Sequence, residues 1–120
     1  MATDKLIQTS RKPTLLWTNP TPGSSISAST LASGIDFDGF NMFLLLYEVY
    51  VGTGKYNTAN LIRGYQTELF FVTDTSNPNG NVSYRYISVD NGAIAVTDGK
   101  RGDGQTNNGV CIPLKLYGIG

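Results

Sequence analysis

The residues that carry most enzyme chemistry are scarce in this chain. Its 120 residues include no histidine and a single cysteine, Cys111. Without histidine, the Ser-His-Asp and Cys-His catalytic arrangements and every histidine-ligated metal site are excluded. A lone cysteine forms no internal disulfide and lacks the second sulfur that a zinc site needs. Because Cys111 lies in an apolar segment, we expect a buried and unreactive thiol.

Carboxylates offer the remaining route to catalysis, because two paired carboxylates can act as general acid and general base. The acidic residues near apolar segments show no spacing that pairs them: Asp36, Asp38, Glu48 and Glu68. Asp98 and Asp103 lie in a glycine-rich loop that lacks the ordered oxygen spacing of a calcium-binding EF-hand. We therefore predict a protein that is not an enzyme and that uses no metal or cofactor.

Two short strings are similar to known binding motifs. Residues 52–55 (GTGK) are similar to part of a phosphate-binding loop, but the first glycine is misplaced and Tyr56 follows where a magnesium-binding serine or threonine is needed. Residues 101–103 (RGD) spell the tripeptide that animal integrins bind. We interpret both strings as loop sequence. Whether the loop over residues 98–109 binds anything is left open.

The overall charge excludes further classes of partner. Nine basic and nine acidic residues cancel, so no electrostatic field attracts nucleic acid or an anionic membrane. The longest apolar run, residues 42–47, is too short to span a bilayer. Residues 1–10 lack the apolar region of a secretory signal. We expect a protein that is made and folded in a cytoplasm.

The alternation of apolar residues and the turn signals predict strands almost throughout. Expected strands cover residues 12–18, 26–31, 42–51, 65–73, 82–89, 93–97 and a final strand after residue 109. Residues 90–92 (DNG) predict a hairpin turn, and residues 19–25, 33–41, 52–60, 74–81 and 98–109 read as loops. The one candidate helical turn is 58–63. Strands at this spacing predict an all-β fold, an antiparallel β-sandwich of jelly-roll-like form, over residues 14–120, preceded by an N-terminal arm over residues 1–13.

Two of these strands are apolar on both faces. In the final strand, alternation puts Ile112, Leu114 and Leu116 on one face. The opposite face then carries Cys111, Pro113, Lys115 and Tyr117. Residues 42–51 are apolar on both sides except at Glu48. Because one sandwich interior covers one face of each sheet, we expect these strands to supply core or trimer contacts. The candidates are Leu44, Leu46, Ile112, Leu114 and Leu116.

Tyrosine is the most suggestive aromatic residue, with seven copies. Its ring offers an apolar face and one polar group, which suits sugar or protein binding. Tyr84 and Tyr86 share one face of their strand, and we interpret them as packing against the partner sheet. Tyr56 and Tyr65 flank loop segments and are the candidate contacts for a host cell-surface saccharide.

Four segments together resemble a known family. They are residues 15–19 (LLWTN), 35–40 (IDFDGF), 63–65 (RGY) and 112–119 (IPLKLYGI). This pattern, from residue 15 to residue 120, resembles a small β-domain of bacteriophage and prophage virion surface proteins, found at the ends of tail and tail-fibre chains. The resemblance implies a β-sandwich, usually trimeric, displayed on a virion, with no catalytic residues to transfer.

The chain departs from that family in one respect. The family domain usually follows a long shaft or anchor, whereas about fourteen residues precede the LLWTN segment here. Residues 1–13 are then either an anchor or the arm of an independent building block. The predicted function is a virion structural protein, either a head decoration, a head fibre or a small tail component, that docks on other virion proteins as a homotrimer. The alternative is a receptor-binding domain that recognises a host cell-surface saccharide.

Overall fold

The computed structural model describes residues 12–62, 68–73 and 82–120. Within these ranges the chain forms nine strands and no helix. The strands are β1 (Thr14–Thr18), β2 (Ser29–Ala32), β3 (Met42–Tyr50), β4 (Tyr56–Ile62), β5 (Glu68–Thr73), β6 (Val82–Asp90), β7 (Ala93–Val96), β8 (Lys100–Arg101) and β9 (Val110–Ile119). The described part of the chain therefore holds no helix with the length and hydropathy needed to cross a bilayer.

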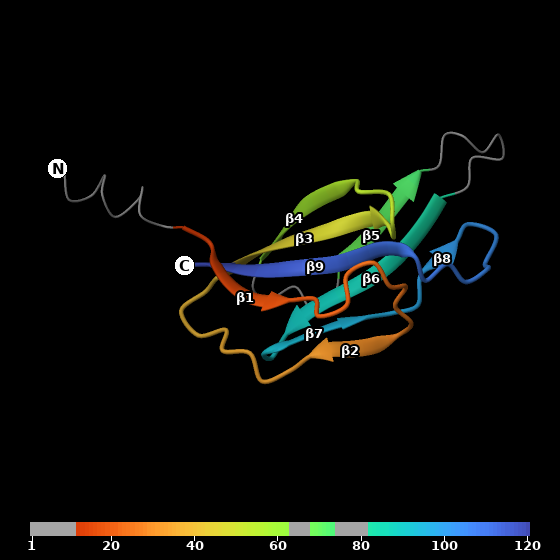
Figure 1. Ribbon diagram of the computed structural model, residues 1–120. Helices are drawn as coiled ribbons and strands as arrows, with labels where there is room; N and C mark the ends of the chain where they lie inside the picture. Colours follow the sequence, from red (N-terminus) through yellow and green to blue (C-terminus); the bar gives the residue numbers. More distant parts are fainter. Residues whose placement is uncertain (1–11, 63–67, 74–81) are drawn as a thin grey trace.

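The strands form two antiparallel sheets that pack face to face (Figure 1). Sheet A has the order β1-β9-β3-β4, and sheet B has the order β2-β7-β6-β5, with β8 added beside β6. The pairing of β1 with β9 brings the first and last described strands side by side in sheet A, and β2 pairs with the distant β7 in sheet B. These two long-range pairings give the sandwich its jelly-roll-like wrapping. The predicted all-β sandwich is confirmed.

The core lies between the sheets and begins with β3. Phe43 and Leu45 point inward from β3, and each is at most 2% exposed. They pack against sheet B residues such as Ile87 and Ile94. The core also contains Phe37, Phe70, Val89, Val96, Val110, Cys111 and Leu116. β3 has hydrogen-bonded neighbours on both edges, as its apolar sequence predicts for a central strand.

The hairpin between β6 and β7 forms where the sequence predicts it. Asp90 pairs with Ala93, and the two residues between them have positive φ angles, 50° at Asn91 and 73° at Gly92. Two consecutive positive φ angles define the type I′ turn that matches the twist of a hairpin. Gly92 also lies against the β2–β3 loop, because the Ile35 amide donates to its carbonyl oxygen at 2.9 Å.

Three local predictions are wrong. The loop predicted over residues 52–60 ends earlier, because Tyr56 already pairs with Glu48 as the first residue of β4. The helical turn considered at 58–63 is likewise extended strand as far as Ile62. The loop over residues 98–109 contains the short strand β8, in which Lys100 pairs with Tyr84. Of the strand predicted over residues 65–73, the described part begins at Glu68, and Tyr65 lies outside the described residues.

The prediction that Ile112, Leu114 and Leu116 share a face is also wrong. Leu46 pairs with Lys115 and Tyr47 with Pro113, so Leu114 is an extra residue in a β-bulge. A one-residue shift exchanges the faces of all residues beyond it. Leu116 therefore points into the core beside Leu45, whereas Ile112 pairs with Glu48 on the opposite side. For the same reason, Pro113 and Tyr117 do not share a face.

The last residues of β9 lie beside the start of β1, at one end of the sandwich (Figure 1). Gly118 is buried beneath the ring of Phe40, and a Cβ atom at this position would lie 2.6 Å from that ring. The Asn41 amide donates to the Ile119 carbonyl oxygen at 3.3 Å. The chain therefore needs glycine in its terminal YGI segment so that Phe40 can cover the strand.

Candidate functional site

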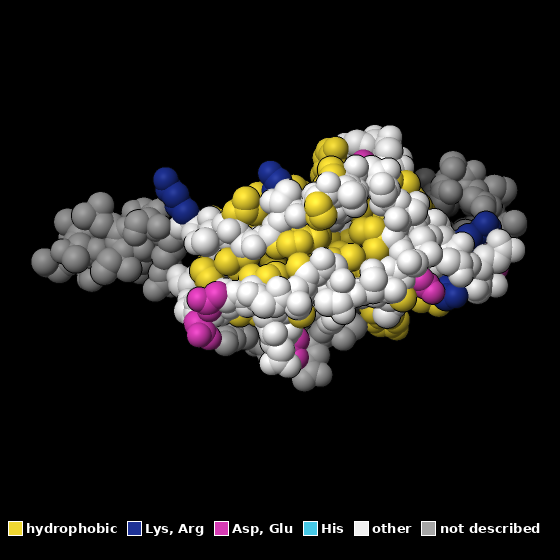
Figure 2. Space-filling view, turned by 60° about the horizontal axis from the view of Figure 1, so that its bottom comes forward, with side chains coloured by type: hydrophobic (Ala, Val, Ile, Leu, Met, Phe, Trp, Pro, Cys, Tyr) yellow, Lys and Arg dark blue, Asp and Glu magenta, His cyan; other side chains and the backbone are white. Residues whose placement is uncertain are grey.

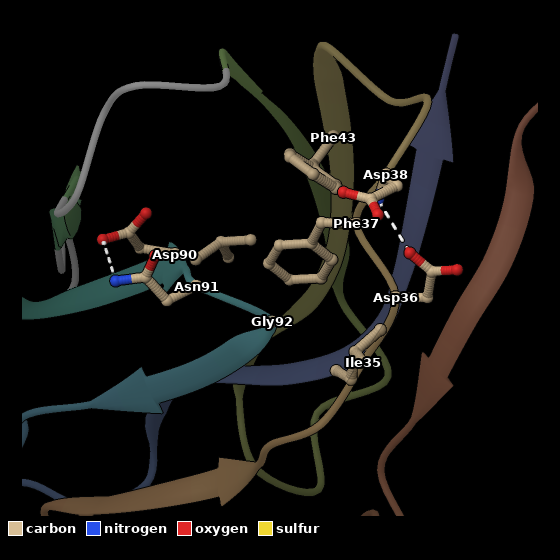
Figure 3. Close-up of a pocket in the computed structure, with 9 residues that line it drawn as sticks. Ile35, Asp36, Phe37, Asp38, Phe43, Asp90, Asn91 and Gly92 are labelled. Atoms are coloured by element: carbon tan, nitrogen blue, oxygen red, sulfur yellow. Dashed lines mark hydrogen bonds between the residues drawn. The ribbon is translucent and has the colours of Figure 1, made fainter.

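A pocket lies at one end of the sandwich, between the β2–β3 loop and the β6–β7 turn (Figure 3). Its volume is about 510 Å³. Asp36 and Asp38 lie on one wall and Asp90 and Asn91 on the other, with the ring of Phe37 between them (Figure 3). Ile35, Phe43, Val89 and Gly92 complete the lining.

Two carboxylates of this pocket accept hydrogen bonds from residues close to them in the sequence. Asp36 Oδ1 accepts a hydrogen bond from the Asp38 amide at 2.9 Å, and Asp90 Oδ2 accepts one from Asn91 Nδ2 at 3.3 Å. No group of three or more metal-ligating side chains forms among the described residues. The pocket offers hydrogen-bond acceptors around an apolar floor, and its lining contains no cysteine, serine or lysine that could act as a nucleophile.

A second pocket, of about 350 Å³, lies on the open side of the sandwich between β1 and β2. Trp17 and Leu31 line it together with a set of uncharged polar side chains: Asn19, Thr21, Ser25, Ser27, Ser29 and Thr30. Figure 2 views the molecule from the side where β2 lies, and hydrophobic side chains form a band across the middle of this view. Asn19 serves the fold, because its Nδ2 donates to the Pro113 carbonyl oxygen at 2.9 Å.

A buried arginine is the most unusual polar group in the core. Arg85 is 0% exposed and points inward from β6. Its Nη2 donates to the carbonyl oxygens of Ile26 and Asn108 and to the Asn108 side chain, whereas its Nε and Nη1 have no hydrogen-bond partner among the described residues. Burial lowers the pKa of Arg85, since desolvation disfavours the charged form. The hydrogen bonds of Arg85 therefore connect the loops at residues 26 and 108 to sheet B, while two buried N–H groups of its guanidinium find no acceptor among the described residues.

Cys111 lies in the core at the start of β9 and is free, as predicted. It is 0% exposed, and its φ angle of 48° is unusual for a residue other than glycine. Burial raises the pKa of the Cys111 thiol to about 11, against a smaller opposing effect of Arg85. A thiol that stays protonated at neutral pH and is closed to solvent is not a nucleophile.

Residues of the GTGK and RGD strings form a hydrogen bond and an ion pair within or next to their own loops. In the β3–β4 connection, the Gly54 amide donates to Glu48 Oε2 at 3.0 Å, so a carboxylate already occupies a backbone donor that a phosphate would need. In the RGD string, Arg101 Nη2 and Asp103 Oδ2 form an ion pair at 3.2 Å. The Arg101 and Asp103 side chains therefore contact each other at the tip of their loop.

The outer side of sheet A carries an apolar face, which we define by Leu15, Met42, Leu44, Leu46, Tyr117 and Ile119. Cross-strand pairs place these side chains together, since Tyr117 pairs with both Leu15 and Leu44, and Met42 pairs with Ile119. Leu15 is 51% exposed and the other five are half-buried. Of the predicted contact residues, Leu44 and Leu46 lie on this face.

The other three predicted contact residues lie elsewhere. Leu116 belongs to the core and is 0% exposed. Ile112 is also 0% exposed but lies outside the main core cluster, on the Glu48 side of sheet A. Leu114 occupies the bulge and is half-buried.

The outer side of sheet B carries an aromatic patch that the sequence interpretation missed. We define it by Leu69, Phe71, Tyr84 and Tyr86. Tyr84 and Tyr86 were expected to pack against the partner sheet, but the inward positions of β6 are taken by Ser83, Arg85 and Ile87. The sequence of β6 shows that Tyr84 and Tyr86 lie on one face and Arg85 on the other. It does not show that Arg85 is the buried residue, because arginine is almost never fully buried.

The two candidate receptor contacts have different outcomes. Tyr56 is 57% exposed at the start of β4, on the outer side of sheet A next to Glu48. Tyr65 lies outside the described residues. The prediction that these two tyrosines contact a saccharide stays a prediction.

Comparisons with known proteins add no relative to this description. No family model, no curated protein and no solved structure matches the chain.

Proposed function

We propose that this chain is a structural protein of a bacteriophage virion, a head decoration, head fibre or small tail component, that assembles as a homotrimer and docks on a larger shell or tail. One observation carries the proposal: the apolar face on the outer side of sheet A. Leu15 is 51% exposed beside partly exposed Met, Leu, Tyr and Ile side chains, and a contiguous apolar surface of this kind suits contact with a protein partner.

The size of the apolar face supports a protein partner. Its Cα positions extend about 13 Å along β3, from Met42 to Leu46, and about 10 Å across β1, β9 and β3. Between Cα positions this is roughly 130 Å², so the face would form the apolar centre of an interface whose standard size is roughly 800 Å² on each partner. Copies of the same chain are the occupants that closed symmetry provides most directly.

The chemistry of the described side chains also favours a structural role. The thiol is closed to solvent, and the Asp36 and Asp90 carboxylates of the pocket accept hydrogen bonds from groups beside them.

A substitution on the apolar face tests this function. Leu44→Glu places a charge at the centre of the face and should convert the trimer to a monomer that no longer joins virions. Ser88→Glu adds the same charge to the outer side of sheet B and should leave assembly intact. Antibody labelling of virions from the encoding phage reports incorporation. Unlabelled virions, or a Leu44→Glu protein that assembles normally, would contradict the proposal.

A second function, recognition of a host cell-surface saccharide, is favoured by exposed aromatic rings. Tyr56 is 57% exposed, a position that suits stacking on a sugar. Tyr56→Ala, together with the predicted contact variant Tyr65→Ala, should weaken adsorption to host cells without changing the oligomer. Unchanged adsorption would restrict the role of these tyrosines to the structure of the domain.

A further inference from the structure

The four residues of the aromatic patch on sheet B lie next to one another and form one continuous surface. Leu69 pairs with Tyr86, and Phe71 pairs with Tyr84, across the β5–β6 ladder. The rings of Tyr84 and Tyr86 contact edge to face, with centroids 6.4 Å apart and planes at 81°. Phe71 is 63% exposed, Leu69 47% and Tyr86 42%, so that their apolar surfaces face solvent.

The sheet behind the patch holds these rings in place. Between the outward residues, Phe70 pairs with Arg85, and both are buried, with exposed fractions of 6% and 0%. The hydrogen bonds of Arg85 attach this part of β6 to the loops at residues 26 and 108. The backbone that carries the patch is therefore held in place before a ligand arrives, which lowers the entropy cost of binding.

The dimensions of the patch suit a small flat ligand. Its Cα positions extend about 7 Å along the strands and about 5 Å across them, roughly a quarter of the area of the apolar face on sheet A. A stable protein interface takes about 800 Å² from each partner, so the patch is too small to hold a second copy. One or two sugar rings cover such an area.

The charge described beside the patch is too small to bind a polyanion. The basic residue paired beside it is Lys100, opposite Tyr84, and its Nζ already contacts Thr106 Oγ1 at 3.1 Å. The neighbouring Thr97 is exposed, and its hydroxyl oxygen accepts from the Tyr86 amide at 3.1 Å. Single-stranded nucleic acid also stacks on aromatic sheet surfaces, but it needs a positively charged groove, and this chain has no net charge.

We propose that the aromatic patch is a binding site for a neutral saccharide. The C–H faces of its pyranose rings stack on Phe71 and Tyr86, while the hydroxyl groups of Tyr84 and Tyr86 and the ammonium group of Lys100 hydrogen-bond to sugar hydroxyls. The inference rests on the second function above and gives it a site on the sheet opposite to Tyr56. It is independent of the trimer, which uses the other outer face.

Calorimetric titration of the full chain tests the site. The probes are the hexasaccharides of N-acetylglucosamine, glucose and mannose, with a twelve-nucleotide oligothymidylate as the competing class. At least one saccharide should bind, and Phe71→Ala and Tyr86→Ala should each weaken its binding by about tenfold. Tyr86→Phe keeps the ring and should retain most of the affinity. Thr18→Ala, at an exposed position of β1 on the other sheet, is the control and should bind normally. Tyr56→Ala tests the alternative contact on sheet A.

The outcomes separate this inference from the proposed assembly. No binding of any saccharide, or loss of binding only in Tyr56→Ala, overturns the site. Tighter binding of the oligonucleotide assigns the patch to nucleic acid instead. A lower particle mass for Phe71→Ala identifies the patch as a protein interface. A chain that binds saccharide through Phe71 and Tyr86 but is monomeric supports the site and contradicts the trimer.

Discussion

Replacement of Arg85 by methionine should cost far less stability than replacement by alanine. Arg85 is 0% exposed, with three hydrogen bonds from Nη2 and, among the described residues, none from Nε or Nη1. Each hydrogen bond from a charged donor contributes about 1.5–3 kcal/mol, and each unpaired buried donor costs about 1–3 kcal/mol. Desolvation of the guanidinium adds several kcal/mol to the cost. Arg85→Met removes both sides of this balance and keeps most of the volume. The Asn108 oxygens keep the amides of Ile26 and Gly99 as donors, and the Ile26 carbonyl oxygen loses its Arg85 donor, at a cost of about 1–3 kcal/mol.

The net change for Arg85→Met should therefore stay within about 2 kcal/mol of zero. Arg85→Ala also leaves a cavity, which for a large buried side chain costs about 2–5 kcal/mol more. Urea unfolding followed by the fluorescence of Trp17, which packs against the core, measures both variants. Equal losses for methionine and alanine would refute the reasoning, because the hydrogen bonds of Nη2 alone would then carry the stability of this region.

Three further predictions concern the terminal strand. Burial raises the pKa of the Cys111 thiol from an ordinary 9.0 to about 11, so its contribution to stability is complete below pH 9 and falls by about 2–3 kcal/mol as the pH rises to 11. The free energy of unfolding of the Cys111→Ala protein should lack this fall between pH 9 and pH 11. Parallel curves of stability against pH for the two proteins would contradict the prediction. Gly118→Ala should lower the melting temperature by several degrees, because its Cβ would lie 2.6 Å from the Phe40 ring, and Phe40→Leu should relieve the clash. Removal of residues 116–120 deletes the buried Leu116, which alone contributes about 2–5 kcal/mol, and should give unfolded or insoluble protein. A soluble truncated chain with a cooperative thermal transition would show that the end of β9 is dispensable.

Much of the fold could be predicted from local signals in the sequence. The apolar run of β3 predicted a central strand, and the DNG turn predicted the hairpin between Asp90 and Ala93, because positive φ angles at Asn91 and Gly92 suit those residues. β4 escaped prediction because Asn57, Thr58 and Asn60 resemble loop residues. They are stable as a strand because β3 supplies the hydrogen-bonded neighbour.

The faces of the strands were harder to predict than the strands. The bulge at Leu114 and the positive φ angle of Cys111 change which residues of β9 point inward, and both arise from pairing with β3 rather than from local sequence. The burial of Arg85 likewise sends Tyr84 and Tyr86 outward. For this reason the apolar face was partly predicted, through Leu44 and Leu46, while the aromatic patch emerged only from the packed sandwich.

The mass of the particle in solution tests the central claim of this account most directly. Light scattering coupled to gel filtration, at micromolar concentrations of the full chain, should give about 39 kDa, three times the 13.0 kDa of one chain. The Leu44→Glu protein should elute at the mass of one chain under the same conditions. A wild-type particle of 13.0 kDa at every concentration, with no trimer in virions, would contradict the claim that the apolar face of sheet A is an assembly surface.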